Sequence, residues 1–459
     1  MWWLATTLQV LAFAVLSAPA LAGTEHFPRP ASMEPQIRFW RSVFTEWGEH
    51  HVVVHDSVDL DKVYVVIDMT DDADRMGPIE LERVRKARTA YEEERVRTML
   101  LRFHRGAKPV TADERRIYAM FDGDRSADRF RIAATDDRLR TQRGIKERFK
   151  RGIEHQRRYR EAMERIFREE GLPVELTRMP LIESCFDVNA YSHAGAAGIW
   201  QFMPSTGRRF MTVGDRVDER RDPLRSTRAA ARFLRENHDS LGSWPLAITG
   251  YNHGPGGIAR AVDAVGTTDI GVIVERYNGP SFGFASRNFY AEFLAALEVE
   301  RDAEKHFGPI QVRPLPEGTE LYLDRSLGIG VAAGLARTST AELVSLNPAL
   351  MPSVVQGRHY IPAGYKLRLP PEAAAGFDGR LASLEVETRV TRTARPTVRG
   401  DRTHGSRAHA SRTHKVQRGQ TLTAIAKRYR VTVSALRAAN GLRNSNTIRA
   451  GQVLRIPNS

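Results

Sequence analysis

The chain has 459 residues, and its 69 lysines and arginines against 55 aspartates and glutamates give a formal net charge of +14. A mean hydropathy of −0.41 excludes a polytopic membrane protein. A single cysteine, Cys185, excludes an internal disulfide and a cysteine-based zinc cluster. Residues 389–459 hold 16 basic residues and one acidic residue, so the remaining 53 basic and 54 acidic residues nearly cancel. The basic character therefore belongs to the C-terminal part and does not by itself indicate a nucleic-acid-binding protein.

Residues 1–22 carry no charged side chain and predict a cleavable signal peptide. An apolar stretch from Leu8 to Leu16 is followed by Ala20-Leu21-Ala22, the small-x-small pattern of a signal peptidase site. The alternative is an uncleaved anchor helix, but polar residues and a proline interrupt the apolar run. No lipobox cysteine follows the cleavage site, so we expect export to the periplasm or cell envelope without a lipid anchor there.

Residues 23–155 predict a mixed, mostly helical N-terminal region. Apolar residues at helical spacing, short valine-rich runs and charged amphipathic stretches alternate along it. The pattern predicts helices over 36–47, 79–104 and 143–171, and strands over 50–55 and 63–67. The last of these helices is expected to end at Gly171-Leu172-Pro173.

Residues 156–310 predict a mainly α domain, because helical patterns alternate with glycine, proline and asparagine turns and no long period-2 segment occurs. Its most informative segment begins with an apolar helix that ends in Glu183-Ser184. A carboxyl group at such a helix end, beside a cleft, is expected to have a raised pKa, as a general acid needs. The alternative interpretation is a buried helix pair with a capping carboxylate.

A turn of very small residues and then an aromatic segment follow this carboxyl group. Gly195-Ala196-Ala197-Gly198 would let a bulky ligand lie against the backbone, and Trp200, Phe202 and Met203 add apolar surface suited to sugar faces. Gln201 is a polar group that could orient such a ligand. For Trp200, packing beneath the cleft and contact with sugar are equally compatible with the sequence.

The order of these motifs resembles that of the lytic murein transglycosylases, whose catalytic domain is goose-lysozyme-like. The resemblance covers about residues 160–305 and rests on four ordered motifs: Glu183-Ser184, the Gly195–Gly198 turn with Trp200-Gln201 and Pro204-Ser205-Thr206-Gly207, Tyr251-Asn252, and Arg287-Asn288-Phe289-Tyr290. Gly250 stands where the family usually has alanine before Tyr-Asn. The fold class implied is a mainly α (lysozyme-like α+β) catalytic domain.

The resemblance also implies roles for individual residues. Glu183 matches the single catalytic acid/base, and Ser184 matches a hydroxyl group that orients the substrate. Three further residues match positions lining the glycan cleft: Gln201, Tyr251 and Asn252. Tyr290 resembles the residue that orients the catalytic carboxylate. No metal and no cofactor is implied.

The implied reaction is non-hydrolytic cleavage of the β-1,4 bond between N-acetylmuramic acid and N-acetylglucosamine. Glu183 would protonate the glycosidic oxygen and then deprotonate the muramoyl C6 hydroxyl, which closes a 1,6-anhydro ring. Two-carboxylate glycosidases need a second acid, and Asp187 and Asp222 are the nearby candidates, but each is better explained as a cap or ion-pair partner. The alternatives are a hydrolytic muramidase of the same fold and a catalytically inert peptidoglycan-binding scaffold.

Two C-terminal stretches resemble each other. Residues 413–459 resemble a LysM module, a βααβ binder of glycans that contain N-acetylglucosamine, and residues 311–372 resemble a degenerate copy. The degenerate copy could equally be a subdomain that packs against the catalytic domain. Between the two copies, residues 373–412 predict a basic disordered linker, because Val390–Thr413 is rich in arginine and has almost no apolar content.

The expected partners follow from this organisation. Peptidoglycan glycan strands would occupy the catalytic cleft and the LysM module. The basic linker could contact an anionic envelope polymer or lipid. No nucleic-acid partner is expected, because Tyr429 is the only aromatic residue of the basic tail.

Overall fold

The computed structural model describes residues 26–315, 317–383, 413–417, 420–429, 431–442, 448 and 451–457. It divides into two compact units, residues 1–384 and 385–459, which we describe separately. The predicted signal peptide and residues 384–412 of the predicted linker lie outside the described residues. Of the helices that are described, none combines the length and the apolar character needed to cross a membrane.

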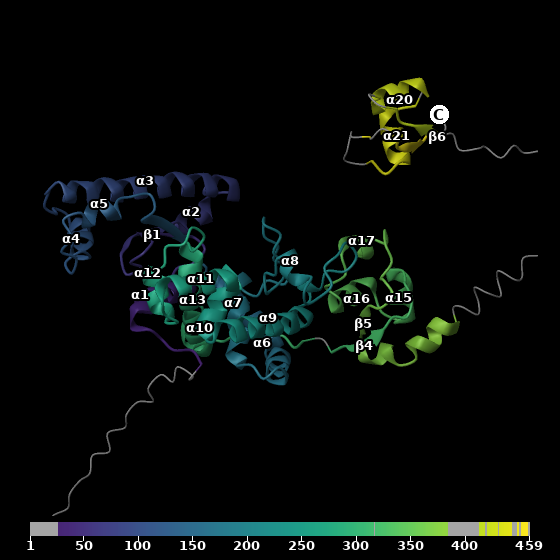
Figure 1. The fold of residues 1–459 in the computed structure, drawn as a ribbon, viewed down its shortest axis with the longest axis horizontal. Coiled ribbons are helices and arrows are strands. Elements are labelled where there is room, and N and C mark those ends of the chain that lie inside the picture. Colours follow the sequence, from purple (N-terminus) through teal and green to yellow (C-terminus); the bar gives the residue numbers. More distant parts are fainter. Residues whose placement is uncertain are drawn as a thin grey trace, which may run out of the picture. The chain divides into compact units, whose positions relative to one another are not determined.

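The first unit is built around a buried helix, α13 (Phe284–Arg301), so the predicted mainly α class is confirmed. Small and aromatic residues such as Phe289, Ala291, Phe293 and Ala295 are buried along it, which lets other helices approach closely. The helices that share its core are α1 (Glu34–Thr45), α6 (Lys146–Glu169), α7 (Met179–Ser184), α9 (Pro223–Leu241), α10 (Trp244–His253), α11 (Pro255–Val265) and α12 (Ile270–Arg276). Figure 1 shows this helical body. In the chain, α13 is followed by the short helix α14 (Ala303–Phe307).

The N-terminal helix α1 belongs to the same core. It packs along α13, and the ring of Phe44 stacks on Phe149 of α6 at 4.2 Å between centroids. The indole Nε1 of Trp40 donates a hydrogen bond to Asn288 Oδ1 at 3.2 Å. The domain boundary predicted between residues 155 and 156 therefore falls inside α6 and separates α1 from its own core. Amphipathic spacing predicts that a helix is buried, but it does not identify the surface against which the helix packs.

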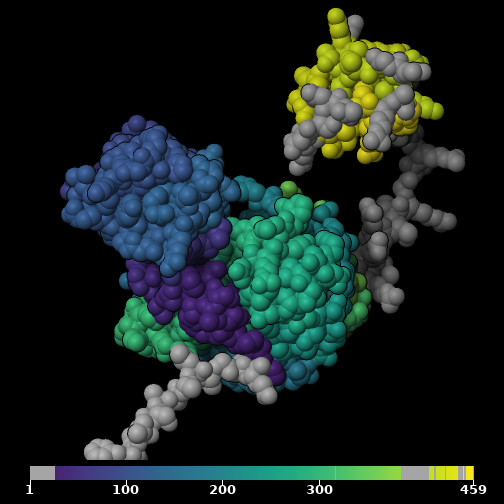
Figure 2. Space-filling model, turned by 60° about the vertical axis from the view of Figure 1, so that its left-hand side comes forward, coloured from purple at the N-terminus to yellow at the C-terminus, as the bar shows by residue number. Residues whose placement is uncertain are grey.

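A separate lobe follows α1 in the chain. Its antiparallel sheet has the order β2-β1-β3, and its own core surrounds Tyr64, Leu100 and Phe103. The elements are β1 (His51–Asp56), β2 (Val63–Asp68), α2 (Thr70–Arg75), α3 (Pro78–His104), α4 (Ala112–Ala119), α5 (Arg129–Ala133) and β3 (Leu139–Arg143). In Figure 2 the lobe is blue, and the chain near the N-terminus (purple) lies between it and the helical body.

Strand β3 was not predicted, and the helix expected from residue 143 begins instead at Lys146. The strand has the sequence Leu-Arg-Thr-Gln-Arg, in which only Leu139 is buried. Its place in the sheet depends on backbone pairing with β1, with Val53 opposite Gln142, and an apolar pattern does not reveal such pairing.

Residues 319–383 form a subdomain with its own core that remains attached to the helical body. Its elements are β4 (Thr319–Tyr322), α15 (Ile329–Leu335), α16 (Thr340–Leu346), α17 (Pro352–Val355), β5 (Lys366–Leu369) and α18 (Pro371–Ala374). The linker was predicted to begin at residue 373, but Ala373, Phe377 and Leu381 are buried in this core. The apolar spacing of Phe377 and Leu381 is that of one helix face, and it ends the subdomain about ten residues later than expected.

The second unit has the predicted βααβ order. It contains the same hydrogen-bond motif as the subdomain at residues 319–383. Its elements are β6 (Thr413–Lys415), α20 (Leu422–Arg428), α21 (Val433–Ala439) and β7 (Val453–Arg455). The side-chain amide of Asn440 donates to the carbonyl groups of Leu436 and Arg455 and accepts from the Arg455 backbone N–H. Asn347 makes the same three bonds, to Leu343 and Arg368. The internal repeat is therefore also a structural repeat.

Candidate active site

Glu183 lies in the last turn of α7, a six-residue helix whose apolar face is fully buried through Met179 and Leu181. Its carboxyl group is half-buried, and within the described part of the chain no hydrogen bond or ion pair compensates for the water that it has lost. Desolvation therefore raises the pKa of Glu183 to about 8. The carboxyl group is protonated at neutral pH, so it can donate a proton.

The chain turns sharply immediately after this carboxyl group. Cys185 and Phe186 both have positive φ angles, 50° and 55°, and their backbone N–H groups donate to the carbonyls of Leu181 and Pro180. Gly152 of α6 permits this turn, because a Cβ at that position would lie 2.7 Å from the Cys185 carbonyl oxygen. The end of α7 is thus fixed by close backbone contact with α6.

Cys185 itself is buried, and desolvation raises the pKa of its thiol to about 11. The thiol is therefore protonated at neutral pH and packs as a small apolar group. Ser184 is also buried, and its hydroxyl group donates to the Ile199 carbonyl at 3.0 Å. The hydroxyl is directed into the protein, where it ties α7 to the following loop.

That loop contains the predicted turn of small residues, and it is held by a buried arginine. Gly195 and Gly198 have φ angles of 90° and 74°, and Ala197 bridges to both Tyr191 and Phe202. Arg220 is 3% exposed, and its guanidinium donates to the carbonyls of Gly195 and Phe202 while it pairs with Asp218.

Two predicted residues follow this turn. Gln201 adopts a φ of 47° and donates from Nε2 to the Gly198 carbonyl at 2.8 Å, so its amide stiffens the turn. Trp200 is fully buried and donates from Nε1 to Thr227 Oγ1 at 2.9 Å. Of the two interpretations of Trp200, packing beneath the site is the one that the structure supports.

Tyr251 and Asn252 come from the last turns of α10 and approach the same region. The hydroxyl group of Tyr251 donates to the Trp200 carbonyl at 2.9 Å. Desolvation and the nearby charge of Glu183 raise its pKa well above the usual value. Asn252 is exposed, and its Oδ1 accepts a hydrogen bond from the Ser286 hydroxyl at 3.1 Å. The structure therefore brings Tyr251 next to Glu183 and leaves Asn252 accessible to a ligand.

The hydroxyl group of Tyr290, which was expected to orient the catalytic carboxylate, has a partner in the N-terminal segment. Tyr290 is 1% exposed, and its hydroxyl group donates to the Pro28 carbonyl at 2.7 Å. This bond uses the only hydroxyl proton of Tyr290, so the residue fastens the N-terminal segment to α13. The role of Tyr290 in orienting Glu183 stays a prediction.

Two residues that the sequence analysis did not identify lie close to the site. Glu292 of α13 is half-buried, and desolvation together with the charge of Glu183 raises its pKa to about 8. Tyr191 lies in the loop after α7 and is 69% exposed. The packing of α7 against α13 brings Glu292 to the site, and no local sequence pattern records that packing. Tyr191 could have been found as an exposed aromatic residue beside the glycine turn.

Comparison with known proteins finds a family match in each of the two units. Residues 163–274 match the family described as "Transglycosylase SLT domain", and residues 414–457 match "LysM domain". Membrane-bound lytic murein transglycosylase D of Escherichia coli (strain K12) is 29% identical over 304 residues, which cover 63% of this chain and 61% of the relative. A putative tributyltin chloride resistance protein of Alteromonas sp. (strain M-1) is 41% identical over 97 residues, 21% of this chain and 47% of that protein.

Two solved structures are also similar to part of the chain. The structure of an inactive mutant of the lytic transglycosylase Slt of Pseudomonas aeruginosa matches with 22% identity and a TM-score of 0.27. The match covers 33% of this chain and 25% of the Slt chain. The structure of the 70 kDa soluble lytic transglycosylase of Escherichia coli matches with 17% identity and a TM-score of 0.29. The match covers 48% of this chain and 44% of the Escherichia coli chain. The chain spans 61% of the length of the first curated relative.

Proposed function

We propose that this chain, which carries a transglycosylase SLT domain and a LysM domain, is a peptidoglycan lytic transglycosylase. The observation that carries the proposal is the environment of Glu183, a half-buried carboxyl group with a pKa of about 8 inside the matched region. A protonated carboxyl group at neutral pH is what cleavage of a glycosidic bond requires from a general acid.

In the proposed reaction Glu183 donates its proton to the oxygen between N-acetylmuramic acid and N-acetylglucosamine as the C1–O bond breaks. The resulting carboxylate removes the proton of the muramoyl C6 hydroxyl, whose oxygen bonds to C1 and closes the 1,6-anhydro ring. The proton balance of Glu183 is restored in one turnover, and no second carboxylate is needed because the nucleophile is part of the substrate. Ionisation of Glu183 removes the acid, so activity should fall as the pH rises through about 8.

The surrounding residues support this step in different ways. We propose that Gln201, Tyr251 and Asn252 line the glycan cleft, with Asn252 as the exposed polar contact. Ser184 acts as a positioning residue, since its hydroxyl group is bonded to the Ile199 carbonyl. Glu292 titrates close to Glu183, and the charge of Glu183 opposes its ionisation, so Glu292 adds no second negative charge to the site while it is protonated.

The test is the mass spectrum of products released from purified sacculi by the full chain. Glu183→Gln should abolish release, whereas Asp187→Asn, at a carboxyl group four residues further along the chain, should retain it. Products one water lighter than reducing-end fragments indicate the lyase reaction, and reducing ends would instead indicate a hydrolytic muramidase. Full activity of the Glu183→Gln protein would refute the assignment of the acid, and an inactive wild type would favour an inert scaffold.

We also propose that the protein is exported to the cell envelope and binds peptidoglycan through both the cleft and the LysM domain. The support is the apolar segment at residues 1–22 and the LysM match at residues 414–457. The arginines between residues 389 and 412 add positive charge that suits an anionic envelope polymer or lipid. Binding of the full chain to anionic vesicles should weaken steeply with salt, and binding to sacculi should weaken less.

A further inference from the structure

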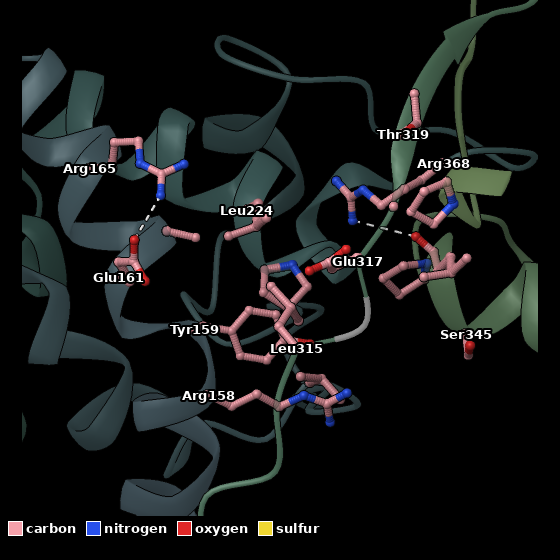
Figure 3. Close-up of a pocket in the computed structure, with 17 residues that line it drawn as sticks. Arg158, Tyr159, Glu161, Arg165, Leu224, Leu315, Glu317, Thr319, Ser345 and Arg368 are labelled. Carbon is pink, nitrogen blue, oxygen red and sulfur yellow. Dashed lines mark hydrogen bonds and ion pairs between the residues drawn. The ribbon is translucent and has the colours of Figure 1, made fainter. Parts of the chain in front are cut away.

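A cavity of about 970 Å³ lies between the helical body and the subdomain at residues 319–383. One wall is the face of α6 around Arg158, Tyr159 and Ala162, and the opposite wall comes from β4, β5 and the end of α16. Figure 3 shows Arg158, Tyr159 and Leu315 at one side of the cavity and Thr319 and Arg368 at the other. The volume is that of a site for a short peptide or a comparable small molecule.

The charges of the cavity are only partly neutralised by the protein. Arg165 is paired with Glu161 at 3.0 Å, and Arg368 is paired with Glu320 at 3.1 Å. Among the described residues, Arg158 has neither an ion pair nor a hydrogen bond, and its Nε is buried without a partner. A buried guanidinium nitrogen without a partner is costly, so a bound acceptor would relieve that cost.

The remaining residues of the lining suit a short peptide that carries both a positive and a negative charge. Glu317 lines the cavity without an ion pair in the described part of the chain, which places a carboxylate in the same space as the unpaired Arg158. Leu224, Leu315 and Pro348 provide apolar contacts. A short zwitterionic peptide with small apolar side chains satisfies the free guanidinium, the free carboxylate and the apolar walls together.

The cavity is also connected to the candidate active site through the chain. Val188 lines it and follows Glu183 by only five residues. The ring of Tyr159 packs on Phe186, which forms the sharp turn at the end of α7, at 5.7 Å between centroids. Five residues span at most about 18 Å, a distance that a peptide of four or five residues can cover.

From the unpaired Arg158, the mixed lining and this proximity, we propose that the cavity binds the stem peptide of the peptidoglycan strand that occupies the cleft. The inference rests on the proposed function for the identity of the ligand. A carboxylate of the peptide accepts hydrogen bonds from the Arg158 guanidinium, and its amino group faces Glu317. The cavity thereby gives the subdomain a role in recognising peptide-substituted glycan.

Calorimetric titration of the full chain with a synthetic peptidoglycan stem tetrapeptide tests the site directly. The wild type should bind the peptide with free carboxylates, and Arg158→Gln should weaken binding about tenfold, the loss expected for a charge-assisted hydrogen bond. Arg168→Gln, on the same helix but outside the cavity, is the matched control and should bind as the wild type does. The same peptide with amidated carboxylates should bind about as weakly to the wild type as the free peptide does to Arg158→Gln.

A second variant guards against a folding defect in the first. Thr319→Trp places a large side chain in the cavity from an exposed strand position and keeps Arg158. It should abolish binding because it fills the space that the peptide would occupy. Unchanged affinity in Arg158→Gln or Thr319→Trp, equal binding of the amidated peptide, or no binding to the wild type would each overturn the inference. Since the titration does not involve catalysis, these outcomes are independent of whether sacculi are cleaved.

Discussion

At the scale of single residues, the site concentrates two carboxyl groups in an environment that disfavours their charge. Desolvation raises the pKa of Glu183 to about 8, and desolvation with the charge of Glu183 does the same for Glu292. An isolated carboxyl group has a pKa near 4.3, so the folded chain holds protons that the unfolded chain releases between about pH 4.5 and pH 8. The same burial that makes Glu183 an acid therefore costs stability as the pH rises through this window.

Glu183→Gln should accordingly stabilise the protein in a pH-dependent way. At pH 4 the carboxyl group is protonated in both states and the substitution should be nearly neutral. Above pH 8 the wild type carries the full cost, and the variant should be more stable by the order of 2 kcal/mol, a value reduced for the partial exposure of the group. Thermal melts at pH 4, 6 and 8.5 measure the difference, with Glu161→Gln as an exposed control. A difference that does not change with pH would show that Glu183 is not held protonated by the fold.

The hydroxyl group of Tyr290 provides a second test at the residue scale. Because it donates to the Pro28 carbonyl at 2.7 Å, Tyr290→Phe should cost about 1 kcal/mol of stability through the lost buried hydrogen bond. The turnover rate on sacculi and its pH profile should stay unchanged. A large fall in turnover, with the melting temperature preserved, would instead support the role that the sequence motif implied, in which the hydroxyl group orients Glu183.

At the scale of elements, the turn after α7 depends on the absence of a side chain at one position. Gly198 has a φ of 74°, and a Cβ there would lie 1.8 Å from the Arg220 carbonyl oxygen. Gly198→Ala should therefore destabilise the protein by about 3 kcal/mol or more, because both the backbone conformation and the space are incompatible with a side chain. Gly171→Ala is the control, since Gly171 also has a positive φ of 65° but has nothing within 4 Å of the added Cβ. Its cost should be about 1 kcal/mol in the same denaturant titration.

Sequence patterns predicted the helices and strands much better than they predicted which of them pack or pair with one another. The helix spacing of Ile37, Trp40 and Phe44 predicted α1, but only the folded chain shows that it packs on α13 and α6. The motifs brought Glu183 and Tyr251 to attention, whereas Glu292 was missed because its proximity to Glu183 is created by helix packing. Strand β3 was missed for the same reason, since backbone pairing and not its side chains holds it in the sheet. The local spacing of apolar residues indicates which face of an element is buried, but it does not indicate which distant segment covers that face.

At the scale of the whole molecule, the two copies of the internal repeat differ in how they are attached to the rest of the chain. The second forms a unit of its own with residues 385–459. The first, at residues 319–383, shares its core with Val217, and backbone hydrogen bonds join Asp218 to Ala349 and Met351 to Arg216 at 2.8 and 3.0 Å. The Arg225 guanidinium reaches further across the boundary, to the Lys366 carbonyl at 2.6 Å. The first copy is thus an integral part of the first unit, in agreement with the original interpretation that it packs against the preceding domain.

Two truncated chains test this difference between the two copies. Removal of residues 385–459 should leave the melting temperature of the first unit unchanged within about 1 °C, and it should weaken binding to sacculi because the LysM domain is lost. Removal of residues 311–459 should additionally expose Val217 and leave the backbone groups of Arg216 and Asp218 without their partners. We expect that loss to cost at least about 2 kcal/mol, or roughly 5 °C in melting temperature. Equal melting temperatures for the two shortened chains would mean that the first copy is an independent domain, and the peptide cavity at its boundary would then lose one of its two fixed walls.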